Sequence, residues 1–307
     1  MVFTPPPLCW LVALLGIGLS AAAAETFRVA TYNLQNYLDA PSGTRAAKPA
    51  AARAKIRESI HAARADVLAL QEVGGTNALL ELRAALKAGG LDYPHWEHVA
   101  AWDTNIHLAV LSRFPIIARR PHTNDSFVLL AKQYHVRRGF AEVDVRVTTN
   151  YTFTLLTAHL KSRLPGYEAD EAELRTEEAK ILRAKIDARF ALDPDVNLVV
   201  LGDFNDTPDA RSTRAIIGRR HALIDTRPAE RNGDDQPGAN PRAPPPKITW
   251  THHYAKEDRY SRIDYIMVSR GLAREWVTNE TFIPTLPNWG VGSDHRLIVV
   301  TFLAEDK

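Results

Sequence analysis

Six short segments of the 307-residue chain place metal-binding or proton-transferring side chains next to apolar runs. In most of them the run precedes the polar residue, and in the Asp264 and Asp294 segments an apolar run follows it. The polar residues are Asn33, Glu72, His159, Asp203 with Asn205, Asp264, and Asp294 with His295. Such residues at strand ends meet at one edge of a sheet, so the pattern predicts that all six segments face one site.

Carboxylate, amide and imidazole groups in such a cluster suit the metal-assisted attack of water on a phosphate ester. This reaction requires a nucleophilic water, charge stabilisation on the phosphoryl oxygens and protonation of a leaving oxygen, and a divalent ion assists the first two. The alternative for Asp203-Phe204-Asn205-Asp206 alone is a polar turn, because Asp and Asn favour turns through side-chain to backbone hydrogen bonds. The presence of all six segments favours a catalytic site over a set of unrelated polar turns.

In their order along the chain, the six segments resemble the motifs of the endonuclease/exonuclease/phosphatase superfamily. Its members include pancreatic-type deoxyribonucleases, abasic-site endonucleases, inositol-polyphosphate phosphatases and neutral sphingomyelinases. The resemblance runs from about Phe27 to Phe302. It implies an α/β (α+β) fold like that of deoxyribonuclease I, which is a four-layer sandwich of two mixed β-sheets flanked by helices. The site is then expected at one end of the sheets.

The resemblance implies a metal centre at Glu72, supported by Asn33 and Asp294. Hard oxygen ligands suit Mg²⁺, with Mn²⁺ or Ca²⁺ as alternatives. Several relatives carry an acid at the second residue after the matched Asn, whereas this chain has Gln35. That difference favours a single ion over two.

The resemblance also implies the catalytic residues. Asp264 is expected to orient and polarise His295, which acts as a general base or as a phosphate-stabilising imidazolium. Asp203 and Asn205 are expected to position or activate the attacking water and to contact the scissile phosphate. His159 donates either a proton or a hydrogen bond to the phosphate, and the sequence leaves these two roles open.

Arg113 and Lys161 are candidate substrate contacts. A planar guanidinium binds phosphate oxygens in a bidentate manner, while a lysine provides a point charge. A plain surface role is equally compatible with Lys161. Basic residues also gather in the middle of the chain, as expected either of a path for a phosphate backbone or of a solvated surface. They are Arg113, Arg119, Arg120, Lys132, Arg137 and Arg138.

Residues 1–24 contain no Asp, Glu, Lys or Arg, and their apolar stretch ends in small residues. This pattern predicts a signal peptide over 1–24, although no basic residue precedes the apolar run; the alternative is an uncleaved anchor. Residues 25–307 are then expected to form a single domain. The only cysteine, Cys9, lies in the signal, so disulfides and cysteine-ligated zinc are excluded from the mature chain. The net charge of +2 neither requires nor excludes a nucleic-acid substrate.

Hydrophobic periodicity predicts three helices and nine strands. The helices are expected at 53–64, 77–88 and 168–192. The strands are expected at 27–34, 67–70, 106–111, 116–118, 140–147, 152–158, 196–201, 263–269 and 297–303. Residues 226–247 are rich in Pro, Gly, Asn and Asp and are expected to form a flexible loop within the domain. No repeat of fixed period is visible.

The leading hypothesis is a secreted or periplasmic, metal-dependent phosphodiesterase that cuts DNA or RNA. Nucleic acid is the expected substrate, and a monomer without an obligate protein partner is expected. The alternatives are a lipid phosphodiesterase like a sphingomyelinase, a phosphomonoesterase, and a binding protein that has kept the fold without activity. The lipid reading requires an exposed apolar projection, for which residues 282–289 are the candidate.

Overall fold

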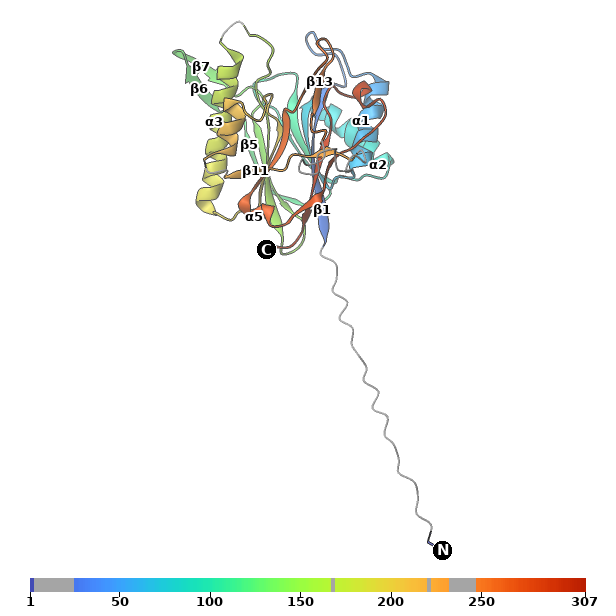
Figure 1. The fold of residues 1–307 in the computed structure, drawn as a ribbon. Coiled ribbons are helices and arrows are strands. Elements are labelled where there is room, and N and C mark those ends of the chain that lie inside the picture. The colour runs from blue at the N-terminus through green and yellow to red at the C-terminus, as the bar shows by residue number, and fades with distance from the viewer. Residues whose placement is uncertain (3–24, 167–168, 220–221, 232–246) are drawn as a thin grey trace, which may run out of the picture.

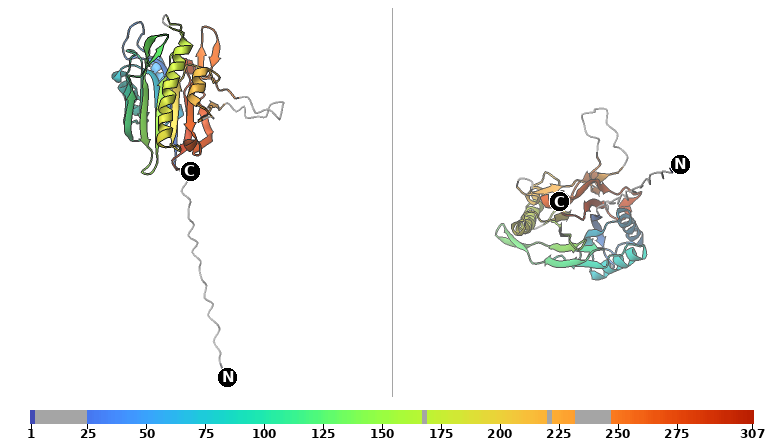
Figure 2. Two further views of the ribbon diagram at one scale, coloured as in Figure 1. Left: turned by 90° about the vertical axis from the view of Figure 1, so that its left-hand side faces the viewer. Right: turned by 90° about the horizontal axis from the view of Figure 1, so that it is seen from below.

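The computed structural model describes residues 1–2, 25–166, 169–219, 222–231 and 247–307. Two large β-sheets pack face to face, and helices cover their outer faces (Figure 1). In the right-hand view of Figure 2, helices lie on both sides of the paired sheets. The four-layer α/β sandwich that the resemblance implies is confirmed.

The larger sheet has seven strands in the order β12-β16-β17-β1-β2-β4-β3. These are β1 (Thr26–Tyr37), β2 (Val67–Val73), β3 (His95–Val99), β4 (His107–Ser112), β12 (Ala229–Glu230), β16 (Trp276–Ile283) and β17 (Ile298–Leu303). The second sheet has six strands in the order β11-β15-β10-β9-β8-β5. These are β5 (Ile116–His122), β8 (Phe140–Arg146), β9 (Thr152–His159), β10 (Leu198–Asp203), β11 (Leu223–Asp225) and β15 (Asp264–Ser269).

Two hairpins and several helices complete the described fold. The hairpins are β6 (Ser126–Leu129) with β7 (Lys132–His135), and β13 (His252–Tyr254) with β14 (Arg259–Ser261). The helices are α1 (Ala50–Ala63), α2 (Thr76–Ala88), α3 (Glu171–Leu192), α4 (Arg211–Ile217), α5 (Arg270–Ala273) and a 3₁₀ turn η1 (Trp289–Val291). No helix among the described residues combines the length and apolar character needed to cross a membrane.

The alternation of side chains along a strand connects the apolar core to the polar end of the molecule. On β1, Ala30 and Tyr32 pack with α1 and α2 on the outer face, whereas Val29 faces the second sheet. Two residues further on the same face, Thr31 forms a buried hydrogen-bonded layer with Gln71 and Thr157. The residues on the inner face of β1 are therefore apolar in the core, polar in the next layer, and end in the site at Asn33.

A parallel pair of strands lies at the centre of each sheet, and β12 adds a second parallel pairing with β16 at the edge of the larger sheet. β1 runs parallel to β2, with α1 as the connection, and β9 runs parallel to β10, with α3 as the connection. The series β1-α1-β2-α2-β3-β4 is matched in order by β9-α3-β10-α4-β11-β15. The internal repeat that the sequence does not show is thus present in the topology.

All nine expected strands and all three expected helices are present, with differences at their ends. The structure also contains strands and α-helices that the sequence does not predict, namely β3, β6, β7, β11, β12, β13, β14, β16, α4 and α5. The helix expected at 168–192 begins at Glu171, because the Asp170 side chain accepts hydrogen bonds from the backbone amides of Ala172 and Glu173. Within the expected loop 226–247, Ala229–Glu230 forms β12 and pairs with β16, so this part is not a loop. Residues 232–246 of that loop and residues 3–24 of the expected signal peptide lie outside the described residues.

We expect the buried carboxylate of Glu142 on β8 to make stability depend on acid pH. Burial raises its pKa, but His122, Arg120 and Arg189 outweigh this effect and lower the pKa to about 2. The folded value lies below the unfolded one, so the stabilisation is complete above pH 4.5 and is lost as the pH falls towards 2. The shift corresponds to about 3 kcal/mol at neutral pH.

Denaturant unfolding from pH 2 to 7 measures this contribution. Glu142→Gln should unfold at lower denaturant at neutral pH and should lose this part of the acid decline. Glu280→Gln is the control, because that carboxylate pairs with Arg28 at the surface. Equal pH profiles for wild type and Glu142→Gln would contradict the prediction.

Candidate active site

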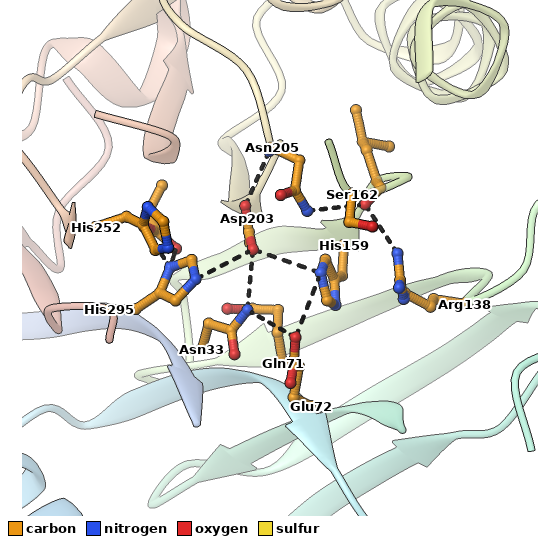
Figure 3. A network of polar contacts seen from close by, with 12 residues as sticks. Asn33, Gln71, Glu72, Arg138, His159, Ser162, Asp203, Asn205, His252 and His295 are labelled. Atoms are coloured by element: carbon orange, nitrogen blue, oxygen red, sulfur yellow. Dashed lines mark hydrogen bonds and ion pairs between the residues drawn. The ribbon is translucent and has the colours of Figure 1, made fainter. Parts of the chain in front are cut away.

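The site lies where the central strands of both sheets end (Figure 3). His159, Asp203 and Asp264 occupy neighbouring positions on β9, β10 and β15, because the strand register pairs Asp203 with both of the others. Asn33 and Glu72 reach the same place from the other sheet. The structure therefore brings these five residues together, as the sequence predicts.

Asp203 is the central group of the site. Its Oδ2 accepts a hydrogen bond from Asn33 Nδ2 at 2.9 Å and lies 3.4 Å from His159 Nε2 and 3.7 Å from His295 Nε2. Its Oδ1 accepts from the Asn205 backbone amide at 2.8 Å. Burial raises the pKa of Asp203 to about 6, so the group is a carboxylate at neutral pH with appreciable affinity for a proton.

His295 is held by Asp264. Its Nδ1 lies 2.9 Å and 3.1 Å from the two oxygens of Asp264, which leaves Nε2 facing Asp203. Burial lowers the pKa of His295, but the carboxylates of Asp264 and Asp203 outweigh this and raise it to about 10. At neutral pH the ring is therefore an imidazolium whose Nε2 proton points into the site.

Glu72 sits on an irregular part of β2. The register with β4 shifts between Leu70 and Val73, and Glu72 has a φ of +60°. This left-handed conformation is uncommon for a residue with a side chain, and it places the carboxylate over Asn33 and Asn36. Glu72 Oε2 accepts from the Asn36 backbone amide at 2.8 Å, and Oε1 accepts from Asn33 Nδ2 at 3.4 Å.

Asp294 fits a cation-binding role. Its backbone amide donates to Gln35 Oε1 at 3.2 Å, so Gln35 holds the segment that carries Asp294. Its Oδ1 is buried without a hydrogen-bond partner among the described residues. Burial raises the pKa of Asp294, but His252 and His295 outweigh this and hold it below its ordinary value. Together with Glu72 and Asn33, the chain offers the oxygen donors that a hard divalent ion prefers.

His159 and Asn205 stand on the side of the second sheet. Burial, assisted by the charge of Arg138, holds the pKa of His159 well below its usual value, so the ring is neutral. Asn205 has a φ of +55°, and its Nδ2 donates to the Leu160 carbonyl at 3.0 Å. Arg138 donates to the same carbonyl at 2.9 Å, which ties the loop after His159 to the site.

Neither candidate substrate contact reaches the cluster. Arg113 follows the end of β4 that pairs with the start of β2, and it forms an ion pair with Asp66 at 2.7 Å. It therefore lies at the opposite end of the sheet from Glu72, and its assignment as a phosphate contact is wrong. Lys161 is close in sequence to His159, but its Nζ donates to the carbonyls of Ser162 and Leu164 at 3.0 Å.

Two arginines of the central basic stretch are engaged in ion pairs away from the site. Arg119 pairs with Glu97, and Arg120 pairs with Glu142 and Asp144, so these two guanidinium groups stabilise strands. Arg138 is the exception, because it lies next to His159 (Figure 3). The local structure explains the difference, since Arg119 and Arg120 lie within β5, whereas Arg138 lies in the turn that precedes β8.

Sequence reasoning missed two residues of the site. His252 packs against His295 with ring centroids 4.6 Å apart and the ring planes tilted by 51°, and it places Nε2 3.7 Å from Asp294 Oδ2. Lys48 is buried, and its Nζ donates to the carbonyls of Leu34 and Gln35 at 2.9 and 2.7 Å. Burial lowers its pKa to about 8, against the attraction of nearby carboxylates. His252 is the first of two adjacent histidines that follow Trp250 and Thr251, whereas nothing in the local pattern marks Lys48.

A model of the Endonuclease/Exonuclease/phosphatase family matches residues 30–295. The chain belongs to this family, whose enzymes hydrolyse phosphate esters and depend on a divalent metal ion. Among curated proteins, none matches the chain by sequence.

Solved structures show the same fold. An endonuclease/exonuclease/phosphatase from Bacteroides vulgatus matches with a TM-score of 0.62 and 16% identity, over 92% of this chain and 100% of that one. The human Nocturnin catalytic domain matches with a TM-score of 0.59 and 18% identity, over 90% and 94%. Sphingomyelinase C from Streptomyces griseocarneus matches with a TM-score of 0.58 and 20% identity, over 91% and 99%. At sequence identities this low, the similarity to these solved structures establishes the fold alone.

We expect Asp264→Asn to lower the pKa of His295 from about 10 towards its ordinary value of 6.5, because the amide removes the nearest negative charge. An NMR titration of the imidazole resonances in metal-free protein measures this change. Asp258→Asn, which alters the partner of His253, is the control and should leave His295 unchanged. A His295 pKa that stays near 10 in Asp264→Asn would refute the assigned pairing.

Proposed function

We propose that the chain is a metal-dependent phosphodiesterase that cleaves nucleic acid by the attack of water. The observation that carries the proposal is the position of His295 between the carboxylates of Asp264 and Asp203. A buried imidazolium next to a carboxylate whose pKa lies near neutral is an acid and base pair suited to proton transfer at physiological pH.

The geometry suggests a division of roles. Asp203 is the group best placed to accept the proton of the attacking water, because it is ionised at neutral pH and lies between His159 and His295. His295 donates Nε2–H to a phosphoryl oxygen. The low pKa of His159 supports a role in which the neutral ring contributes a hydrogen bond to the phosphate and no charge. A divalent ion bound by Asn33, Glu72 and Asp294, with Mg²⁺ first and Mn²⁺ or Ca²⁺ as alternatives, would stabilise negative charge on the phosphoryl oxygens.

The choice of nucleic acid rests on the expected export of the chain. A secreted or periplasmic phosphodiesterase encounters free DNA and RNA, and the site requires only a phosphodiester that can approach the strand ends. A monomer is sufficient for this proposal, because Asp203 and the three residues around it, Asn33, His159 and His295, come together within one chain.

A lipid phosphodiesterase is the second candidate, and one surface feature favours it. The tip of the β6–β7 hairpin exposes Val128 by 70% and Leu130 by 78%, and it lies at the same end of the molecule as β13 (Figure 1). Beside it, Trp102 lines a pocket of about 580 Å³. The sequence instead offered 282–289 as the apolar projection, which is wrong at its start, because Phe282 and Ile283 are buried.

Hydrolysis assays separate the two candidates. The purified protein is offered plasmid DNA, RNA, sphingomyelin vesicles and small phosphate esters, each with Mg²⁺, Mn²⁺, Ca²⁺ or a chelator. We expect metal-dependent loss of nucleic acid. Turnover of sphingomyelin or of a monoester alone would replace the proposed substrate, and no turnover of any substrate would refute the enzymatic proposal.

We expect Glu72→Gln to lower kcat by roughly 100-fold or more, because it removes a charge from the proposed metal centre. Thermal unfolding in chelator should remain close to that of wild type, since Glu72 is partly exposed at a strand end. Glu58→Gln on the exposed face of α1 is the matched control and should be fully active. Wild-type turnover by Glu72→Gln would contradict the assignment.

A further inference from the structure

His252 is held against the site by the backbone. Its neighbour His253 donates its amide to the Asp294 carbonyl at 2.9 Å, and Arg296 donates its amide to the Thr251 carbonyl at 2.7 Å. His252 and His295 form an antiparallel bridge between these two bonds. The imidazole of His252 is therefore fixed beside Asp294 and His295 by main-chain contacts.

The three side chains are spaced like ligands of one ion. His252 Nε2 lies 3.7 Å from Asp294 Oδ2, and His295 Nε2 lies 3.9 Å from Asp294 Oδ1. One ligand atom from each residue falls within 4.8 Å of the others. These separations are too long for hydrogen bonds. Two ligands bound at about 2.1 Å to one ion are separated by roughly 3 to 4 Å, which matches the spacing.

Two further observations point to a missing partner in this position. Asp294 Oδ1 is buried and has no hydrogen-bond partner among the described residues. In addition, Asp264 occupies Nδ1 of His295 and leaves Nε2 directed towards Asp294 and Asp203. A carboxylate on the far nitrogen of a histidine is the arrangement that commonly orients metal-bound imidazoles.

We propose that His252, Asp294 and His295 form a site for a transition-metal ion such as Zn²⁺ or Co²⁺. Two imidazole nitrogens and one carboxylate oxygen are donors that suit these ions, whereas Mg²⁺ and Ca²⁺ prefer oxygen donors throughout. The site differs from the oxygen-donor centre at Asn33 and Glu72 in its donor atoms and shares only Asp294 with it.

This site has a consequence for turnover that rests on the proposed function. The ion would bind at His295 Nε2, the same atom that contacts the phosphoryl oxygen in the proposed function. A bound Zn²⁺ or Co²⁺ and the substrate phosphate therefore compete for this atom. Mg²⁺ supports turnover, and added Zn²⁺ reduces it.

The test measures binding without substrate. Metal-free protein in excess Mg²⁺ is titrated with Co²⁺, whose visible absorption reports nitrogen ligands, and bound metal is counted by elemental analysis. We expect one equivalent to bind with the same spectrum in wild type and in Glu72→Gln, which lacks the oxygen-donor centre. His252→Ala should weaken this binding by about tenfold or more, the order of loss typical when one residue of a metal site is removed.

His253→Ala is the matched control, because His253 is adjacent but pairs with Asp258 at 3.2 Å and stacks on Tyr260. It should bind Co²⁺ as wild type does. Absence of Co²⁺ binding in wild type, or equal binding by His252→Ala, would overturn the proposed site. Loss of binding in Glu72→Gln would assign the ion to the other centre and would also overturn it.

An activity measurement checks the consequence separately. Added Zn²⁺ should inhibit Mg²⁺-dependent hydrolysis by wild type and His253→Ala at concentrations that leave the residual activity of His252→Ala unchanged. Equal inhibition of His252→Ala would refute the exclusion of substrate by the ion. The Co²⁺ titration stands even if no substrate is hydrolysed, so failure of the site and failure of the proposed function are distinguishable.

Discussion

The arrangement of the site depends on the burial of one negative charge. A carboxylate removed from water is stable only when donors and cations surround it, and Asp203 is almost fully buried. Asn33 approaches it from the other sheet, His159 from the next strand and His295 from the segment before β17. The attraction between Asp203 and these groups joins the polar ends of the two sheets, and it keeps His295 charged.

The alternation of side chains along the strands positions these groups in the site. Every second residue of β1, β9 and β10 faces the space between the sheets, so the register that buries Val29, Leu155 and Val199 also places Asn33, His159 and Asp203 in the site. Slippage by one residue would expose the core and remove the site together. Stability and chemistry are thus specified by the same hydrophobic pattern.

The repeated topology explains why the same positions carry different chemistry. The ends of β1 and β9 are equivalent in the two halves and carry Asn33 and His159, and the ends of β2 and β10 carry Glu72 and Asp203. In the proposed mechanism, one half therefore supplies oxygen donors for a cation, and the other supplies a base and a neutral imidazole. Sequence divergence has removed any visible repeat while the layout of the strands has kept it.

The sequence predicts the layers and most site residues because apolar runs and polar strand ends are local features. It does not predict His252 or Lys48, because their roles arise from contacts with Asp294, Leu34 and Gln35 that the chain brings together only on folding. The prediction of Arg113 as a phosphate contact fails for a related reason. A residue next to a strand lies at one of the two ends of the sheet, and which end this is depends on the direction of the strand. Local composition does not specify that direction.

The position of β17 has a consequence for biosynthesis. This strand is the last of the larger sheet along the chain, yet it lies between β16 and β1, and Ser293 just before it donates to the Asn33 carbonyl at 2.8 Å. Asp294 and His295 therefore take their places only after β1 to β16 have been synthesised. A growing polypeptide cannot complete the proposed site until residues 293–303 are available for folding, so the strands are made before the site can assemble.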